Sequence, residues 1–177
     1  PDGDETGHAL DMGAEGVVVP HFGLDRAASA ECVTHARYAP EGTRGTCTGT
    51  PSSGYGLANF TEVVAEANRE ALVVVQIEDG SVALEADSVL SEIPVDAVMP
   101  GLADLSTSLG YPGAFSHPKV SEAVDGIVRA VQARNLPMGF YIPNADALTS
   151  WKGGSVDFYV YAIDYKVVAE GYRNAHT

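Results

Sequence analysis

The chain has 177 residues, of which 45% are hydrophobic and 19% charged, and this composition predicts a single globular domain over residues 1–177 with a sizeable core. The formal net charge of −14 would repel phosphate backbones and anionic lipid surfaces, so we expect neither nucleic acid nor a membrane as a partner. Polar opening residues, the lack of an apolar run of bilayer length, and only two cysteines together favour a reducing, cytoplasmic setting.

Short apolar runs rich in valine, isoleucine and tyrosine recur along the chain. They are continuous rather than alternating, as is typical of parallel strands that are covered on both faces. The runs predict six strands, at residues 16–20, 45–49, 72–78, 97–99, 138–142 and 158–162.

Helical patterns lie between these runs. They predict helices at residues 5–12, 24–38, 59–69, 82–91, 118–134, 144–151 and 165–174. Strands that alternate with helices through short connections indicate an α/β fold with a parallel sheet. Neither GxGxxG nor GxxxxGK[ST] follows any strand, which argues against an open sheet that binds nucleotides.

The number of strands suggests a barrel that is only partly contained in this chain. A closed (β/α)₈ barrel has eight strand–helix units and takes about 250 residues. We therefore expect this chain to carry strands three to eight, with two N-terminal units outside it. Such an incomplete barrel exposes strand edges, so these residues alone should be unstable or oligomeric.

Polar residues end the predicted strand at 72–78. Gln76 and Glu78 share one face, because side chains alternate along a strand. If that face is the barrel interior, both lie near the C-terminal ends of the strands, where barrel enzymes have their active sites. A buried carboxylate is costly unless it is paired or bound to a cation. The alternative is a glutamate that is solvated or paired with a lysine.

Asp104 follows the next predicted strand. Neighbouring strands lie about 4.8 Å apart, so Glu78 and Asp104 could reach one ion. Two carboxylates plus waters suit Mg²⁺ or Mn²⁺. Gly101 would let a ligand approach the backbone, where N–H groups near Ala103 could bind a carboxylate. The alternative is that Asp104 only caps a helix.

His21 is a further candidate, because it follows the strand at 16–20 at its mouth end. It could shuttle a proton or contact a distal substrate group, but a loop histidine without a catalytic role is the interpretation we favour. No lysine lies at a suitable strand end, which disfavours a Schiff-base route.

Several stretches of the chain form an ordered set of motifs: ALDMGAEGVVVPH (9–21), ARYAPEGTRG (36–45), QIED (76–79), GLADLSTSLGYPG (101–113), HP (117–118) and YVYAID (159–164). In these stretches and in their order the sequence resembles the HpcH/HpaI aldolase family. The resemblance implies a (β/α)₈ TIM barrel of the phosphoenolpyruvate/pyruvate type. It also implies a class II aldolase that makes or breaks a C–C bond next to a 2-oxo acid, through a metal-stabilised pyruvate-type enolate, with an aldehyde as the second partner.

The same resemblance assigns roles to residues. Glu78 and Asp104 match metal ligands for Mg²⁺ or Mn²⁺, with Co²⁺ as a further option, and Gln76 matches the glutamine that contacts the oxo acid. A pocket for the substrate carboxylate falls on the backbone of Gly101, Leu102 and Ala103. The family's catalytic histidine and substrate-binding arginine lie on its first two strand–helix units, so we expect both outside this chain.

Other functions remain open from the sequence. The same scaffold is compatible with a 2-oxo acid decarboxylase or a CoA-ester lyase, although we see no basic patch for a nucleotide. A catalytically inactive barrel remnant that acts as a binding or assembly subunit is the alternative of a different kind. The resemblance implies a homo-oligomer, either a hexamer or an assembly of dimers.

Overall fold

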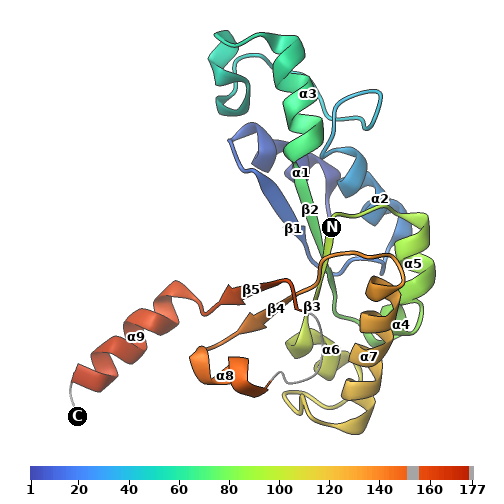
Figure 1. Ribbon diagram of the computed structural model, residues 1–177, viewed down its shortest axis with the longest axis vertical. Coiled ribbons are helices and arrows are strands. Elements are labelled where there is room, and N and C mark those ends of the chain that lie inside the picture. The colour runs from blue at the N-terminus through green and yellow to red at the C-terminus, as the bar shows by residue number, and fades with distance from the viewer. Residues whose placement is uncertain (151–155, 176–177) are drawn as a thin grey trace.

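A computed structural model describes residues 1–150 and 156–175. Within them the chain forms five strands, all paired in parallel (Figure 1). The strands are β1 (Gly16–Val19), β2 (Leu72–Ile77), β3 (Ala97–Pro100), β4 (Gly139–Ile142) and β5 (Phe158–Tyr161). One sheet has the order β1-β2-β3 and the other pairs β4 with β5. A bridge between Val98 and Met138 joins β3 to β4.

The helices lie between the strands as the sequence predicted, except that no strand separates the second α-helix from the third within the described residues. They are α1 (Gly3–Asp11), α2 (Arg26–Thr34), α3 (Phe60–Glu70), α4 (Gly80–Leu84), α5 (Ala86–Glu92), α6 (Leu102–Ser108), α7 (Pro118–Gln132), α8 (Ala145–Ser150) and α9 (Asp164–Ala175), with a 3₁₀ helix η1 (Pro51–Gly56). Across the described residues, no helix is both long and apolar enough to cross a membrane.

The core lies between the sheet and the helices that flank it. Val73, Val75 and Ile77 of β2 are fully buried and pack with residues of α4, α5 and α7. Val74 and Gln76, which alternate with them, are only half-buried and belong to the opposite face. This opposite face corresponds to the interior of the barrel that the sequence predicted, and it carries Gln76 toward the C-terminal end of β2.

The strand predicted at 45–49 is wrong. These residues are exposed coil, and β2 pairs directly with β1 in the place where that strand would lie. The segment GTCTG contains no large apolar side chain that would favour burial in a sheet. Because five strands rather than six form in the described residues, the expectation of strands three to eight is not confirmed.

Two helix predictions also need correction. The helix expected at 82–91 is two helices, α4 and α5, which meet at Glu85 with φ −107° and ψ 13°. The helix expected at 24–38 is shorter and ends at Thr34, and the Asp25 side chain caps its start by accepting from the backbone N–H of Ala28 at 3.0 Å. The last residue of the helix expected at 144–151 lies outside the described residues.

Candidate active site

Glu78 is the first residue after β2, and its side chain is buried with only 5% of the residue exposed. Its Oε1 accepts a hydrogen bond of 2.7 Å from the backbone N–H of His21, which lies just past β1. The Nδ1 atom of the His21 ring is 3.1 Å from the same oxygen. Among the described residues no lysine or arginine pairs with Glu78, so the expected alternative of a lysine partner is not seen there.

The second oxygen of Glu78 lies against Gly101, the residue that follows β3. A Cβ atom at Gly101 would be 2.2 Å from Oε2 and 2.7 Å from the Cβ of Glu78. The backbone N–H of Gly101 donates to the carbonyl of Ile77 at 3.1 Å, which holds the two segments together. A side chain at Gly101 would force Glu78 or the backbone to shift, and the group that approaches this backbone in the structure is the Glu78 side chain.

Asp104 lies in the first turn of α6, and its side chain is exposed. The N-cap of α6 is Gly101, so the alternative that Asp104 only caps this helix is wrong. Residues three apart on a helix are neighbours, with Cβ positions about 5–6 Å apart. Asp104 therefore lies at the same edge of the sheet as Gly101 and the Glu78 carboxylate that Gly101 contacts.

Gln76 lies two residues before Glu78, on the half-buried face of β2. Its backbone carbonyl accepts from the N–H of Phe22 at 3.0 Å, which extends the β1–β2 pairing toward His21. In the part of the chain that the structure describes, the Gln76 side-chain amide has no hydrogen bond to protein. Its two donors and one acceptor are thus available to a ligand.

Two serines of the segment DLSTS support this edge, and sequence reasoning did not single them out. The Ser108 hydroxyl accepts from the backbone N–H of Gly80 at 2.8 Å and so ties α6 to the turn after Glu78. The Ser106 hydroxyl accepts from the N–H of Gly113 at 3.1 Å and holds the following loop. Gly80 is 28 residues from Ser108, so no local signal in the sequence could have identified that role, whereas Ser106 and Gly113 belong to the same motif at 101–113.

Asp79, next to Glu78, has a structural role. Its side chain accepts from the backbone N–H of Ser81 and caps α4. The hydrogen bond from the Ser81 hydroxyl lowers the pKa of the Asp79 carboxyl below its usual range. Asp79 therefore supports the turn after β2.

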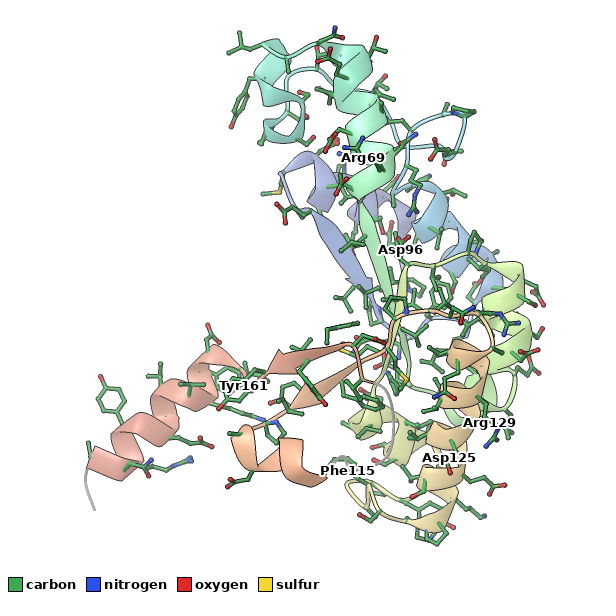
Figure 2. The ribbon with its side chains drawn as sticks, in the orientation of Figure 1. Arg69, Asp96, Phe115, Asp125, Arg129 and Tyr161 are labelled. Atoms are coloured by element: carbon green, nitrogen blue, oxygen red, sulfur yellow. The ribbon has the colours of Figure 1, made fainter. Side chains whose placement is uncertain are left out.

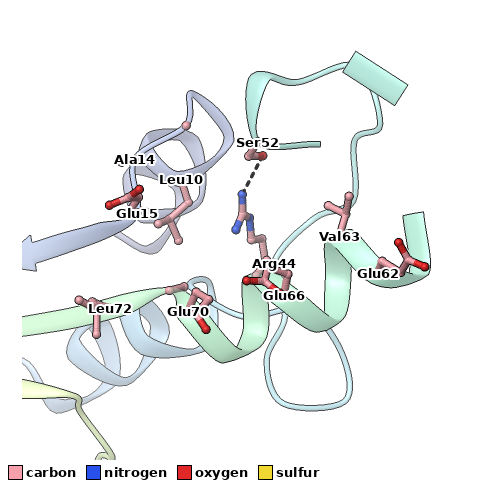
Figure 3. Close-up of a pocket in the computed structure, with 13 residues that line it drawn as sticks. Leu10, Ala14, Glu15, Arg44, Ser52, Glu62, Val63, Glu66, Glu70 and Leu72 are labelled. Atoms are coloured by element: carbon pink, nitrogen blue, oxygen red, sulfur yellow. Dashed lines mark hydrogen bonds between the residues drawn. The ribbon is translucent and has the colours of Figure 1, made fainter. Parts of the chain in front are cut away.

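A hollow lies at the other end of the sheet (Figure 3). Its volume is about 720 Å³, and it is lined by Glu15 before β1, by Glu66 and Glu70 of α3, and by Leu72 at the start of β2. Arg44 also lines it, but this side chain is buried and paired with Asp11. Active sites of parallel barrels lie at the C-terminal ends of the strands, so this hollow is not the candidate site.

Comparison with known proteins identifies the fold family. Residues 2–170 match the family described as HpcH/HpaI aldolase/citrate lyase. The chain belongs to this family. The family resemblance that the sequence motifs indicated is confirmed, and with it the expected TIM-barrel type of fold.

Individual members of the HpcH/HpaI family are similar over much of the chain. A 2-keto-3-deoxy-L-rhamnonate aldolase of Klebsiella pneumoniae is 35% identical over 132 residues, which cover 74% of this chain and 48% of that protein. A 4-hydroxy-2-oxovalerate aldolase of Rhodococcus jostii is 32% identical over 162 residues, which cover 91% of this chain and 61% of that protein. The chain thus spans about half to three fifths of these curated relatives.

A solved HpcH/HpaI structure shows the same fold. The crystal structure of an HpcH/HpaI aldolase from Desulfitobacterium hafniense superposes with a TM-score of 0.81 at 29% sequence identity. The match covers 99% of this chain and 69% of that protein. The fold that brings Glu78, Gly101 and Asp104 to one edge of the sheet is therefore the fold of this family.

Proposed function

We propose that this chain carries the cation-binding edge of a class II aldolase site, in which Glu78 and Asp104 hold a divalent cation. The observation that carries this proposal is the burial of Glu78 without a lysine or arginine partner among the described residues. Taking a carboxylate out of water costs several kcal/mol unless a cation or hydrogen bonds compensate. One oxygen has the His21 amide, whereas the second lies beside Gly101 and is suited to a cation.

The chemistry of the donors fits a hard cation. Carboxylate oxygens suit Mg²⁺, Mn²⁺ or Co²⁺, and Mg²⁺ in particular usually takes only one or two carboxylates from the protein. Within residues 1–150 and 156–175 no group of three or more His, Cys, Asp and Glu side chains is arranged to hold a metal ion. Two protein carboxylates would leave positions for water and substrate.

The substrate in this proposal is a 2-oxo acid of the pyruvate type, and the second partner is an aldehyde. Both relatives described above are named as aldolases of 2-keto or 2-oxo acids, which supports this class. A bound divalent cation would supply a Lewis acid that stabilises the negative charge developing as the C–C bond breaks. The Gln76 amide would orient the acid, because it lies beside Glu78 with no protein partner among the described residues.

The carboxylate of the substrate would bind at the start of α6. The first backbone N–H groups of a helix have no partner within the helix, and in α6 these belong to residues just after Gly101. Leu102 and Ala103 are accordingly proposed to donate to it through the backbone. The His21 ring, 54% exposed, is open to solvent and is proposed only as a contact for the distal part of the substrate.

The test uses the protein at its full natural length, with Mn²⁺ and 4-hydroxy-2-oxo acids, and measures pyruvate release together with Mn²⁺ binding. Glu78→Gln and Asp104→Asn should each lower kcat/KM and Mn²⁺ affinity at least about tenfold, because each removes a charged ligand. Asp125→Asn is the matched control, since Asp125 is exposed on α7 (Figure 2). Full activity of both site variants would refute the proposal.

We further propose that the protein works as a homo-oligomer. Large apolar side chains are exposed on β5 and α9, among them Tyr161, Val167 and Val168, and exposed apolar surface of this kind is often covered by another chain. Light scattering after size-exclusion chromatography would test this. A monodisperse monomer of the full-length protein would contradict it.

A further inference from the structure

The backbone of His21 has a conformation that is unusual for a residue with a side chain. Its φ is 51°, in the left-handed region that non-glycine residues seldom adopt. In this conformation its N–H donates to Oε1 of Glu78 at 2.7 Å, across 57 residues of sequence. Strained backbone of this kind persists only where surrounding contacts determine it, and it is frequent at functional sites.

The neighbours of His21 fix the direction of its amide. Phe22 is fully buried, and its backbone N–H donates to the carbonyl of Gln76 at 3.0 Å. Val19, two residues earlier, is buried and pairs in register with Val75. The chain therefore leaves β1, turns at His21, and is anchored again one residue later, so the amide points at Glu78 without any contribution from the side chain.

The imidazole of His21 is held much less firmly. Its side chain is 54% exposed, and although Nδ1 lies 3.1 Å from Oε1, it is the backbone N–H that makes the hydrogen bond to this oxygen. An exposed side chain can rotate away at little cost, whereas the amide cannot move without breaking the Phe22–Gln76 contact. The contact that holds Oε1 of Glu78 therefore depends on the backbone of His21 rather than on its side chain.

We propose that the backbone amide of His21 is a positioning group for the cation site, which engages Oε1 of Glu78 so that Oε2 alone is presented to the cation. This inference rests on the proposed function. Oε2 lies over Gly101, where the segment that carries Asp104 begins. A carboxylate with one oxygen engaged by the His21 amide and the other left beside Gly101 would serve as a one-oxygen ligand.

The test measures the Kd for Mn²⁺ in variants of the full-length protein. All of them lack the imidazole, but some tolerate the left-handed backbone at position 21 and others do not. His21→Gly and His21→Asn tolerate this conformation and keep the N–H, so their Kd should stay within about threefold of the wild type. His21→Val disfavours the conformation and should raise the Kd on the order of tenfold. If His21→Val does not fold, His21→Ala should raise it about fivefold.

A matched control separates this effect from general destabilisation. Asn135 also has a left-handed backbone, with φ 53°, but it is exposed and precedes β4 at the amino end of the sheet. Asn135→Val should lower the midpoint of urea unfolding while leaving the Kd for Mn²⁺ unchanged. A raised Kd in this control would overturn the inference, because backbone strain alone would then account for the effect at His21.

The outcomes also separate this inference from the proposed function. If the wild type and Glu78→Gln bind Mn²⁺ equally weakly, the proposed function fails and the inference fails with it. If Mn²⁺ binding depends on Glu78 but all His21 variants bind as the wild type does, only the inference fails. Equal losses in His21→Gly, His21→Asn and His21→Val would assign the effect to the imidazole and likewise overturn it.

Discussion

Gly101→Ala tests the packing of Glu78 most directly. The added Cβ would lie 2.2 Å from Oε2 and 2.7 Å from the Cβ of Glu78, well inside van der Waals contact. The φ of Gly101 is −90°, which alanine adopts freely, so the effect would come from the overlap. Relief requires either that Glu78 moves or that the backbone of Gly101 shifts.

Each route has a calculable cost. Moving Glu78 breaks its hydrogen bond with the His21 amide, and hydrogen bonds to charged groups contribute about 1.5–3 kcal/mol. Shifting Gly101 breaks its bond to the Ile77 carbonyl, worth about 1 kcal/mol, and adds overpacking of about 1–3 kcal/mol. We expect the free energy of unfolding to fall by about 2–3 kcal/mol and Mn²⁺ affinity to fall about tenfold to a hundredfold.

Urea unfolding and a Mn²⁺ titration of the full-length protein measure the two effects. Gly45→Ala is the control, because a Cβ there meets no atom within 4 Å, and its stability should change by no more than about 1 kcal/mol. If Gly101→Ala binds Mn²⁺ as tightly as the wild type, the assignment of Oε2 as the atom that meets the cation is refuted.

Three further outcomes are expected. Asn68 is buried and bonds both the N–H and the carbonyl of Tyr38, so Asn68→Ala should lower the free energy of unfolding by about 2–4 kcal/mol in urea, and a change below about 0.5 kcal/mol would contradict this. Burial raises the pKa of the Cys32 thiol, so a thiol reagent at neutral pH should label exposed Cys47 well before Cys32. Equal labelling rates for the two cysteines would contradict the burial of Cys32 in the core. Mn²⁺ at about 100 times its Kd should stabilise the wild type by about 2.7 kcal/mol but Glu78→Gln far less, seen as the shift in Tm; equal shifts in the two proteins would locate Mn²⁺ elsewhere.

Much of the fold could be predicted because its strands are locally distinct. The valine-rich run before Glu78 forms β2 within one residue of its expected end, and the apolar stripe at 118–134 forms α7. The prediction of a strand at 45–49 fails because this segment lies between two helices, where a strand is expected, but consists mainly of glycine and threonine and has no large apolar side chain to bury. The break between α4 and α5 at Glu85 depends on how these two helices pack against α7, and the local sequence contains no signal for that packing.

The candidate site was predictable to a similar degree. Glu78 and Asp104 follow adjacent strands, so their placement at one edge follows from parallel topology. The contact between His21 and Glu78 was not predictable, because it depends on the β1–β2 register and on a left-handed residue after Pro20. The close approach of Glu78 to Gly101 likewise depends on the β2–β3 register rather than on the glycine itself.

The tie between Ser108 and Gly80 has a mechanical consequence. It connects the helix that carries Asp104 to the turn that follows Glu78, through a hydrogen bond within one stretch of about 30 residues. A displacement of α6 would therefore stretch this hydrogen bond or move the turn after Glu78, in addition to any effect on the β2–β3 pairing. A substitution such as Ser108→Ala would remove this link and loosen the turn after Glu78 without changing either carboxylate.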